Sequence, residues 1–181
     1  MKSLIAAASA IAIAAIAAPA FAQSSSYGPV TPYINLGYSY ADSTLNNFSA
    51  NPGFSVIDGR LGAKVGRYLG AEGELAFGVN STDQGGVDYK VRNTYAGYVV
   101  GFLPIMPNAD LFARVGYGHE NLRANVNGQS FTTGTDSINY GAGGEYFLTP
   151  HDGIRVDYTR DEFRQDNGHA NVWGVSYVRK F

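Results

Sequence analysis

The stretch that decides the fold is Ala170–Phe181, which reads Ala-Asn-Val-Trp-Gly-Val-Ser-Tyr-Val-Arg-Lys-Phe. Successive side chains of a β-strand point to opposite faces, so one face of this stretch is large and apolar. That face carries Trp173, Val175, Tyr177 and Phe181, and the other carries Val172, Gly174, Ser176 and Lys180. A strand that finishes on an aromatic residue predicts a sheet that closes on itself, because closure removes the unpaired edge of a last strand.

Seven segments upstream show the same alternation of apolar and polar residues. They are residues 33–41, 57–66, 71–80, 87–100, 109–118, 137–146 and 154–159. The chain also has 23 glycines, 13 tyrosines and 10 phenylalanines, and it shows no long helical pattern. These features predict an all-β protein of eight antiparallel strands. Most strands are about ten residues long, the length that crosses a bilayer as a tilted strand.

The charged residues of these strands fall almost entirely on the polar face, and only Arg179 falls on the apolar one. A soluble barrel of the lipocalin type, which is the alternative, would turn its apolar face inward. Equal numbers of both signs, mixed with glycine, instead suit a narrow lumen in which each charge finds a partner. The predicted lumen charge network consists of Asp58, Arg60, Lys64, Glu72, Glu74, Asp88, Lys90, Arg92, Asp110, Arg114, Glu145, Arg155, Asp157 and Lys180.

The connections alternate in length along most of the chain. Residues 42–56, 81–86, 119–136 and 160–169 are predicted loops, whereas residues 67–70, 103–108 and 149–153 are predicted turns. All the loops follow odd-numbered strands, although 81–86 is as short as a turn. Long loops on one side and short turns on the other are typical of outer-membrane barrels, and this arrangement places both termini on the periplasmic side.

The N-terminal residues predict export. Lys2 precedes an apolar run at 4–18, and Ala20-Phe21-Ala22 forms a small-x-small cleavage site, so residues 1–22 are interpreted as a signal peptide. A membrane anchor is the alternative, but the run is short and rich in alanine. Residues 23–181 then form one domain with 12 Lys and Arg against 15 Asp and Glu, which offers no electrostatic basis for nucleic-acid binding. Because cysteine is absent, disulfides, thiol catalysis and thiolate metal sites are excluded.

Four stretches together resemble the small eight-stranded bacterial outer-membrane β-barrels, namely the OmpA-like transmembrane domain, the OmpX-like proteins and the opacity and porin-like surface proteins. These stretches are LFARVGYG at 111–118, YGAGGEYF at 140–147, GIRVDY at 153–158 and the terminal Phe181. The resemblance implies an integral protein of the bacterial outer membrane, in contact with its lipid and lipopolysaccharide, without a cofactor. It further implies that Trp173, Val175, Tyr177 and Phe181 are the signal that the outer-membrane insertion machinery reads. Arg179 departs from the family pattern, in which this position is apolar or aromatic, although a long cationic side chain can snorkel to the interface.

Tyrosines on the outward face near strand ends predict aromatic girdles at the level of the lipid headgroups. These residues are Tyr38, Tyr40, Tyr89, Tyr117, Tyr140, Tyr158 and Tyr177. In the predicted loops, Leu45, Phe48, Leu122, Phe131 and Phe163 are apolar candidates for contact with a host surface or partner, with packing on the barrel rim as the alternative.

An enzymatic reading has little support in the sequence. It would need His119, His151 or His169 as a general base. The resembling lipid A deacylases place a serine two residues after the histidine, and here that residue is Asn121. The pair Glu72 and Glu74 could suggest glycosidic chemistry, but lumen ion pairs explain it more simply. We therefore expect a non-enzymatic structural or surface-interacting barrel, with a narrow or gated pore as the alternative and a lipid A-modifying enzyme as the third.

Overall fold

The computed structural model describes residues 29–44, 53–79, 82–84, 87–126, 129–164 and 168–181. Side chains are described throughout these ranges except at 82–92 and 122–133. The expected signal peptide lies outside the described residues. So do Leu45 and Phe48, and the side chains of Leu122 and Phe131. Within the described part of the chain, the structure has no helix that is long and apolar enough to span a membrane.

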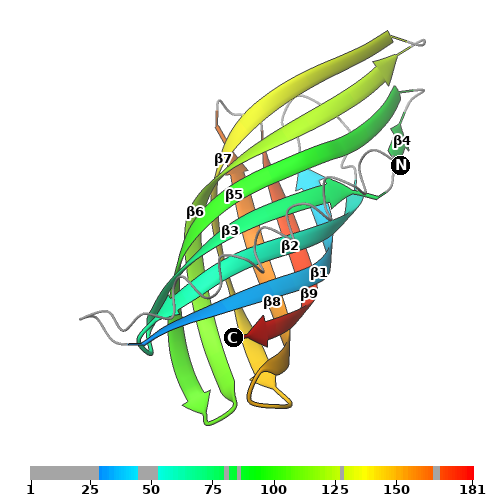
Figure 1. The fold of residues 1–181 in the computed structure, drawn as a ribbon. Helices are drawn as coiled ribbons and strands as arrows, with labels where there is room; N and C mark the ends of the chain where they lie inside the picture. The colour runs from blue at the N-terminus through cyan, green and yellow to red at the C-terminus, as the bar shows by residue number, and fades with distance from the viewer. Residues whose placement is uncertain (1–28, 45–52, 80–81, 85–86, 127–128, 165–167) are drawn as a thin grey trace.

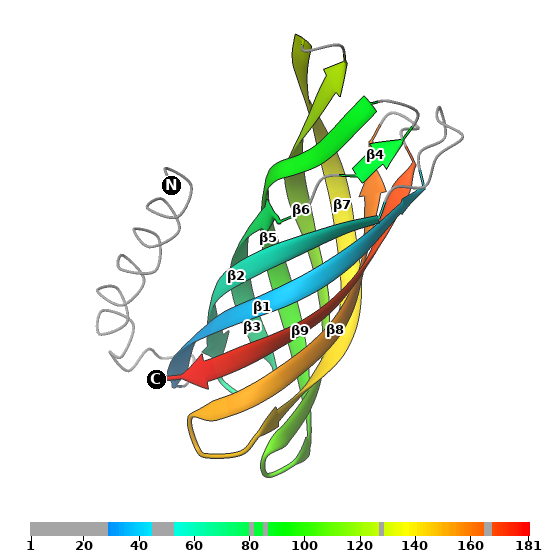
Figure 2. The same cartoon turned by 90° about the vertical axis from the view of Figure 1, so that its right-hand side faces the viewer.

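The described strands form one antiparallel sheet that closes into a barrel (Figures 1 and 2). Their order is β3-β2-β1-β9-β8-β7-β6-β5-β4, and a further pairing of β3 with β5 completes an eight-stranded ring. The predicted eight-stranded barrel is therefore confirmed. The strands are β1 (Val30–Thr44), β2 (Gly53–Val65), β3 (Leu69–Gly78), β4 (Thr82–Gln84), β5 (Val87–Met106), β6 (Ala109–Val126), β7 (Gln129–Phe147), β8 (Asp152–Phe163) and β9 (His169–Lys180).

The last strand occupies the place that its pattern predicts. β9 pairs with β8 on one side and with β1 on the other, so the two ends of the ring meet along β1 and β9. Trp173 lies between Tyr40 of β1 and Tyr158 of β8, and Tyr177 lies between Leu36 and Ile154. The chain therefore closes the sheet by pairing its first strand with its last.

The two ends of the barrel differ. At one end, short turns join the strands, including a turn at Gly66, whose φ of 65° suits glycine. At the other end, β6 and β7 continue as a hairpin well beyond the ring (Figure 1). The pairing of β7 with β8 stops at Ser137 and Phe163, whereas its pairing with β6 extends to Gln129 and Val126.

Several predicted loops were wrong because the strands run further than their apolar alternation. Residues 119–136, predicted as the longest loop, are mostly the β6–β7 hairpin. Much of 42–56 belongs to β1 and β2, residues 160–163 extend β8, and the predicted loop 81–86 contains β4, which pairs with β5. In most of these stretches backbone pairing continues where the side chains become polar, whereas the start of β2 carries the buried apolar residues Phe54 and Val56.

The predicted turn at 103–108 was also too long. β5 reaches Met106, and Pro104 lies inside it opposite Asp110. A register shift between Pro104 and Met106 lets the ladder accommodate a residue without an N–H. A second shift, between Val91 and Asn93, interrupts the alternation that the sequence pattern assumes for β5.

The barrel is inverted relative to a soluble protein. Large apolar residues such as Leu61, Val99 and Leu111 are exposed on its outer wall, whereas Arg60 and Arg155 are fully buried inside. The interior also holds an aromatic and aliphatic cluster that the sequence pattern did not predict. This cluster consists of Tyr33, Tyr98, Val100, Phe102, Phe112, Phe147 and Val178.

Candidate functional site

An ion pair spans the full width of the barrel interior. Arg155 on β8 and Glu72 on β3 lie four strands apart in the eight-stranded ring, on opposite walls. Their Nη1 and Oε1 atoms are 2.5 Å apart, and both side chains have no exposed surface. The hydroxyl of Tyr33 donates to the same carboxylate oxygen at 2.7 Å. A bond across the whole diameter leaves little room along the axis at this level.

A second group of charges joins the walls next to this pair. Arg60 Nε contacts Glu74 Oε2 at 2.6 Å, and its Nη1 donates to Asp157 Oδ1 at 2.8 Å. Arg114 Nη2 donates to the other oxygen of Asp157 at 2.7 Å, and its Nη1 lies 3.3 Å from Glu74. Asp58 lies 3.4 Å from Arg60. Each arginine thus faces more than one carboxylate, which offsets the cost of burying its charge.

A third group of charges lies nearer the short-turn end. Lys64 Nζ donates to Asp110 Oδ2 at 2.7 Å, and Lys180 Nζ lies 3.8 Å from Glu145 Oε1. Lys64 comes from β2 and Asp110 from β6, so this pair also crosses the lumen. Lys180 lies over the ring of Phe147, with Nζ 3.3 Å from its centroid.

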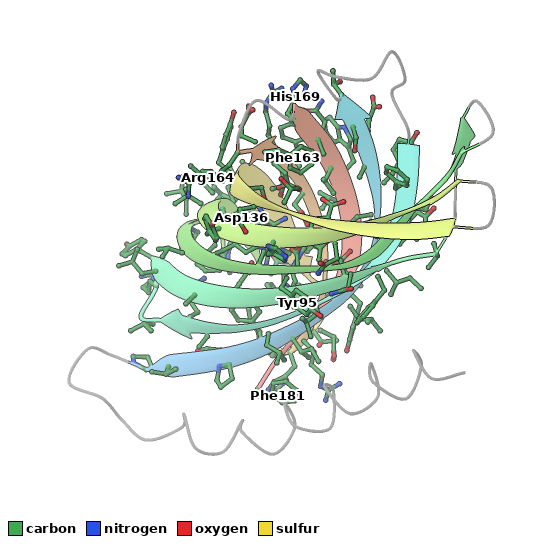
Figure 3. All side chains as sticks on the ribbon, turned by 90° about the horizontal axis from the view of Figure 1, so that it is seen from above. Tyr95, Asp136, Phe163, Arg164, His169 and Phe181 are labelled. Atoms are coloured by element: carbon green, nitrogen blue, oxygen red, sulfur yellow. The ribbon has the colours of Figure 1, made fainter. Side chains whose placement is uncertain are left out.

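Aromatic rings separate these charged levels. The guanidinium of Arg155 lies 3.7 Å from the ring centroid of Phe112, and that of Arg114 lies 4.6 Å from the centroid of Tyr98. Lys64 lies 4.3 Å from the centroid of Phe102. Cation–π contacts are stronger where water is excluded. Figure 3 looks down on the ring of strands from the hairpin end with all described side chains drawn.

The structure thus places eleven of the fourteen predicted lumen charges inside the barrel. Asp88 and Lys90 lie in β5 beyond the register shift and Arg92 lies at it, and the side chains of all three are outside the described ones. Tyr33, Tyr98 and the phenylalanines of the interior were not predicted as partners. Phe102 and Phe147 lie just outside the predicted strand limits, and Phe112 lies among charged residues and glycines on the polar face of its strand.

The outward tyrosines lie near both ends of the barrel. Tyr38, Tyr40, Tyr117, Tyr140 and Tyr177 are about half exposed, Tyr158 is partly buried, and the side chain of Tyr89 is not described. Their hydroxyls reach polar groups: Tyr38 donates to Ser55 at 2.7 Å, Tyr158 to Asn171 at 2.7 Å and Tyr140 to Glu162 at 3.2 Å. At the opposite end, the hydroxyl of Tyr177 donates to Asp152. These rings lie on the outer wall with hydroxyls bound to polar groups, as membrane girdles would require, and Tyr177 is the one named tyrosine at the short-turn end.

The outer face of β9 exposes the residues of the predicted insertion signal. Trp173 and Val175 are at least half exposed, as is the terminal Phe181, and Tyr177 is nearly so. The ring of Trp173 packs on Tyr158, with centroids 4.6 Å apart. Arg179 shares this outer face and forms an ion pair with Asp152 at 3.0 Å.

The histidines are separated from one another. His119 on the hairpin is half exposed, and its Nδ1 lies 2.7 Å from Asp136 Oδ1, a pairing that the sequence pattern did not predict. Hydrogen bonds from His119 and Tyr117 lower the pKa of the Asp136 carboxyl. Arg164 donates its backbone N–H to the carbonyl of Asp136 at 2.9 Å, and both residues are labelled in Figure 3. His151 lies in a turn at the opposite end, and His169 begins β9.

Comparisons with known proteins support the architecture. The model of the family described as the outer membrane protein beta-barrel domain matches residues 8–181. A comparison with curated protein sequences gives no match.

Among solved structures, Ail, the attachment invasion locus protein of Yersinia pestis, is 18% identical with a TM-score of 0.66, covering 83% of this chain and 98% of Ail. Ail has also been solved in complex with the heparin analogue sucrose octasulfate. Neisserial surface protein A is 10% identical with a TM-score of 0.71, covering 83% of this chain and 97% of its own. The N-terminal barrel domain of OprF from Pseudomonas aeruginosa is 11% identical with a TM-score of 0.58, covering 82% and 96%. At these identities the likeness shows the fold.

Proposed function

This chain belongs to the family of outer-membrane proteins with a β-barrel domain, and from that premise we propose an integral outer-membrane protein whose interior is closed and whose projecting β6–β7 hairpin contacts other surfaces. The observation that carries the proposal is the ion pair of Arg155 and Glu72 across the full width of the lumen. Charged and aromatic layers on both sides of this pair support the same conclusion.

Closure of the lumen is tested by electrical conductance. The purified barrel, inserted into planar bilayers, is expected to pass no steady current, because an ion would have to displace buried pairs to cross. Arg114→Ala removes a side chain that contacts Glu74 and Asp157 and should open space for transient currents. A stable channel in the unaltered protein, with a conductance that changes in Arg114→Ala, would establish the alternative of a narrow or gated pore.

The role in surface contact rests on the β6–β7 hairpin. Eight residues of β7, Gln129 to Asp136, extend the hairpin past the last pair with β8. At about 3.3 Å per residue this is on the order of 25 Å of strand. The hairpin end is the natural candidate for the outside of the cell, with the termini in the periplasm.

The orientation can be tested directly because the chain contains no cysteine. Ser130→Cys places a thiol on the hairpin, and His151→Cys places one in a turn at the opposite end. On intact cells, a membrane-impermeant maleimide should label only the first variant, and both should be labelled after lysis. Labelling of the His151→Cys variant alone on intact cells would reverse the proposed orientation.

The class of ligand can be narrowed by charge. The complex of Ail makes a polyanion the first candidate to consider. In this chain, however, the predicted loops 42–56, 81–86, 119–136 and 160–169 together contain seven Asp and Glu against three Lys and Arg. Like charges oppose binding of a sulfated polymer, so we propose a partner that is not a polyanion. The protein should pass unretained through immobilised heparin at low salt, and retention would contradict this assignment.

Biogenesis follows from the same proposal. Residues 1–22 serve as the signal peptide, the domain spans 23–181, and the exposed aromatic face of β9 is read by the insertion machinery. Cell fractionation combined with heat-modifiable gel migration tests the compartment and the folded barrel together. A soluble species without a heat-dependent shift would refute both.

Catalysis on lipid A is the third candidate, and the pair of His119 and Asp136 is the observation that keeps it open. A hydrolase of this kind also needs a nucleophile. Asn121 occupies the position of the serine in the resembling deacylases, and Gly134 lies against the His119 ring. We propose that the protein is not an enzyme, so overexpression should leave the mass spectrum of lipid A unchanged.

A further inference from the structure

An apolar groove lies on the outer wall over β1, β2 and β3. A wall that only faces lipid does not need such a groove. Its volume is about 240 Å³. Gly59 lies in its floor, where the nearest atom to an added Cβ would be the carbonyl oxygen of Asn35 at 4.0 Å. Leu36 and Leu75 are the cross-strand partners of Gly59, so a side chain is missing from the middle of an apolar surface. The groove is lined by Ile34, Leu36, Ile57, Leu61, Phe77 and Tyr177, among others.

A cation lies next to one end of this groove. Tyr177 of β9 lines the groove as the cross-strand partner of Leu36. Arg179, two residues further along β9, is the cross-strand partner of Ile34, another lining residue. Arg179 is half exposed on the outer face, whereas the other predicted strand charges whose side chains the structure describes lie in the lumen. The groove therefore runs from the middle of the wall towards a positive charge near the short-turn end.

The guanidinium is held in place by its neighbours. Asp152 accepts from Arg179 Nη1 at 3.0 Å and also from the hydroxyl of Tyr177. A guanidinium has five N–H donors, so the contacts of Arg179 with Asp152 and Tyr177 leave donors able to bind a second anion. Tyr177 belongs to the proposed girdle at this end, which is the level of the lipid headgroups.

From these observations we propose that the groove is a binding site for one phospholipid, with an acyl chain over Gly59 and an anionic headgroup at Arg179. An acyl chain is the occupant that fits an apolar groove opening into hydrocarbon, and the phosphodiester complements the guanidinium in charge and geometry. The lipid belongs to the leaflet at the short-turn end, which the proposed orientation makes the periplasmic one. The site rests on the proposed placement of the barrel in the membrane.

The test uses native mass spectrometry of the folded protein in detergent, titrated with phosphatidylglycerol or with phosphatidylcholine. The unaltered protein should retain one phosphatidylglycerol in preference to phosphatidylcholine. Arg179→Gln should weaken retention of phosphatidylglycerol about fivefold, the effect of one cation near an anionic lipid, and should leave phosphatidylcholine unchanged. Gly59→Leu, which fills the groove, should weaken retention of both lipids.

Two variants serve as matched controls. Gly97→Leu adds the same side chain at another outward glycine, whose added Cβ would have no atom within 4 Å. Arg67→Gln removes an exposed cation in the turn between β2 and β3. Neither should change retention. Equal retention by the Gly59→Leu and Gly97→Leu variants, or an unchanged headgroup preference in Arg179→Gln, would overturn the site, as would a dimer that Gly59→Leu dissociates.

Heat-modifiable migration of the same samples separates the possible failures. A variant that does not shift has not folded and is replaced by Gly59→Ala, a smaller filling of the same groove. If the unaltered protein shifts but retains no lipid, the lipid site is refuted while the barrel stands. If it does not shift, the proposed membrane barrel itself fails.

Discussion

The inner and outer walls of the barrel are built from the same strands but obey opposite rules. Arg114 and Val115 are neighbours in β6, yet Arg114 is 4% exposed and Val115 is 55% exposed. Inside, stability depends on each charge finding its partner in a space that is nearly filled. Outside, side chains need only be compatible with hydrocarbon. The same chemical change should therefore have different effects on the two walls.

The largest effect is expected from breaking the pair that spans the lumen. Arg155→Met keeps a long side chain on Phe112 but removes the charge that faces Glu72. Loss of one partner from a buried pair costs about 3–5 kcal/mol, because the remaining charge stays buried. Urea unfolding in lipid vesicles, followed by the fluorescence of the lone Trp173, measures this loss.

The control for this change removes both charges. The double variant Arg155→Met/Glu72→Met should recover much of the lost stability. Arg114 Nη1 also lies 3.7 Å from Glu72, but it keeps Asp157 and Glu74 when Glu72 is removed. If the single variant were as stable as the unaltered protein, the pair would not be the strong link across the lumen that its geometry indicates.

The next largest effect is expected from placing a charge on the outer wall. Val115→Arg puts a cation on the lipid face and should cost about 2–4 kcal/mol if the residue lies near the bilayer midplane. Val115→Leu is the matched control and should be nearly neutral. The same vesicle-based unfolding measures both variants, and tolerance of arginine here would contradict the placement of this wall against lipid.

The difference between the walls was visible in the sequence because it depends only on the period of two. Arg60, Glu72, Arg114 and Asp157 alternate with apolar neighbours, so their common face follows without knowledge of the fold. The sequence did not predict which of these charges pair with each other. Arg155 meets Glu72 four strands away only because strand tilt and register bring these residues to one level, and both depend on the whole ring.

The prediction from the sequence also failed at the ends of the strands. Residues 129–136 contain polar and small residues that favour a loop by composition, yet β7 continues through them because β6 supplies backbone partners. The shift between Val91 and Asn93 was likewise hidden, since a bulge leaves little trace beyond one misplaced polar residue. The groove depends on a single glycine, Gly59, that reads like any other in the sequence.

A smaller effect should distinguish inward from outward glycines. At Gly116, an added Cβ would lie 2.2 Å from the carbonyl oxygen of Gly97, whereas at Gly97 it would have no atom within 4 Å. Gly116→Ala should therefore cost about 1–3 kcal/mol through overpacking, and Gly97→Ala should be close to neutral. Equal midpoints of unfolding for the two variants would show that the interior is less filled than the contacts indicate.

The smallest difference is expected from removing a single hydroxyl on each wall. Inside, Asn139 Nδ2 donates to the hydroxyl of Tyr98 at 3.1 Å, and outside, Tyr158 donates to Asn171 at 2.7 Å. Tyr98→Phe leaves a buried amide without its acceptor and should cost about 1–3 kcal/mol, whereas Tyr158→Phe should cost about 0.5–1.5 kcal/mol.

Tyr98→Phe should lose more stability than Tyr158→Phe although Tyr158 has the shorter hydrogen bond. Tyr158 lies at a boundary where other polar groups and solvent can replace its partner. Thermal unfolding followed by the circular dichroism of the strands avoids any direct effect of Tyr158 on the fluorescence of Trp173, which packs on it. A larger loss for Tyr158→Phe than for Tyr98→Phe would mean that bond length, rather than the wall on which a hydroxyl lies, sets its contribution to the stability of this barrel.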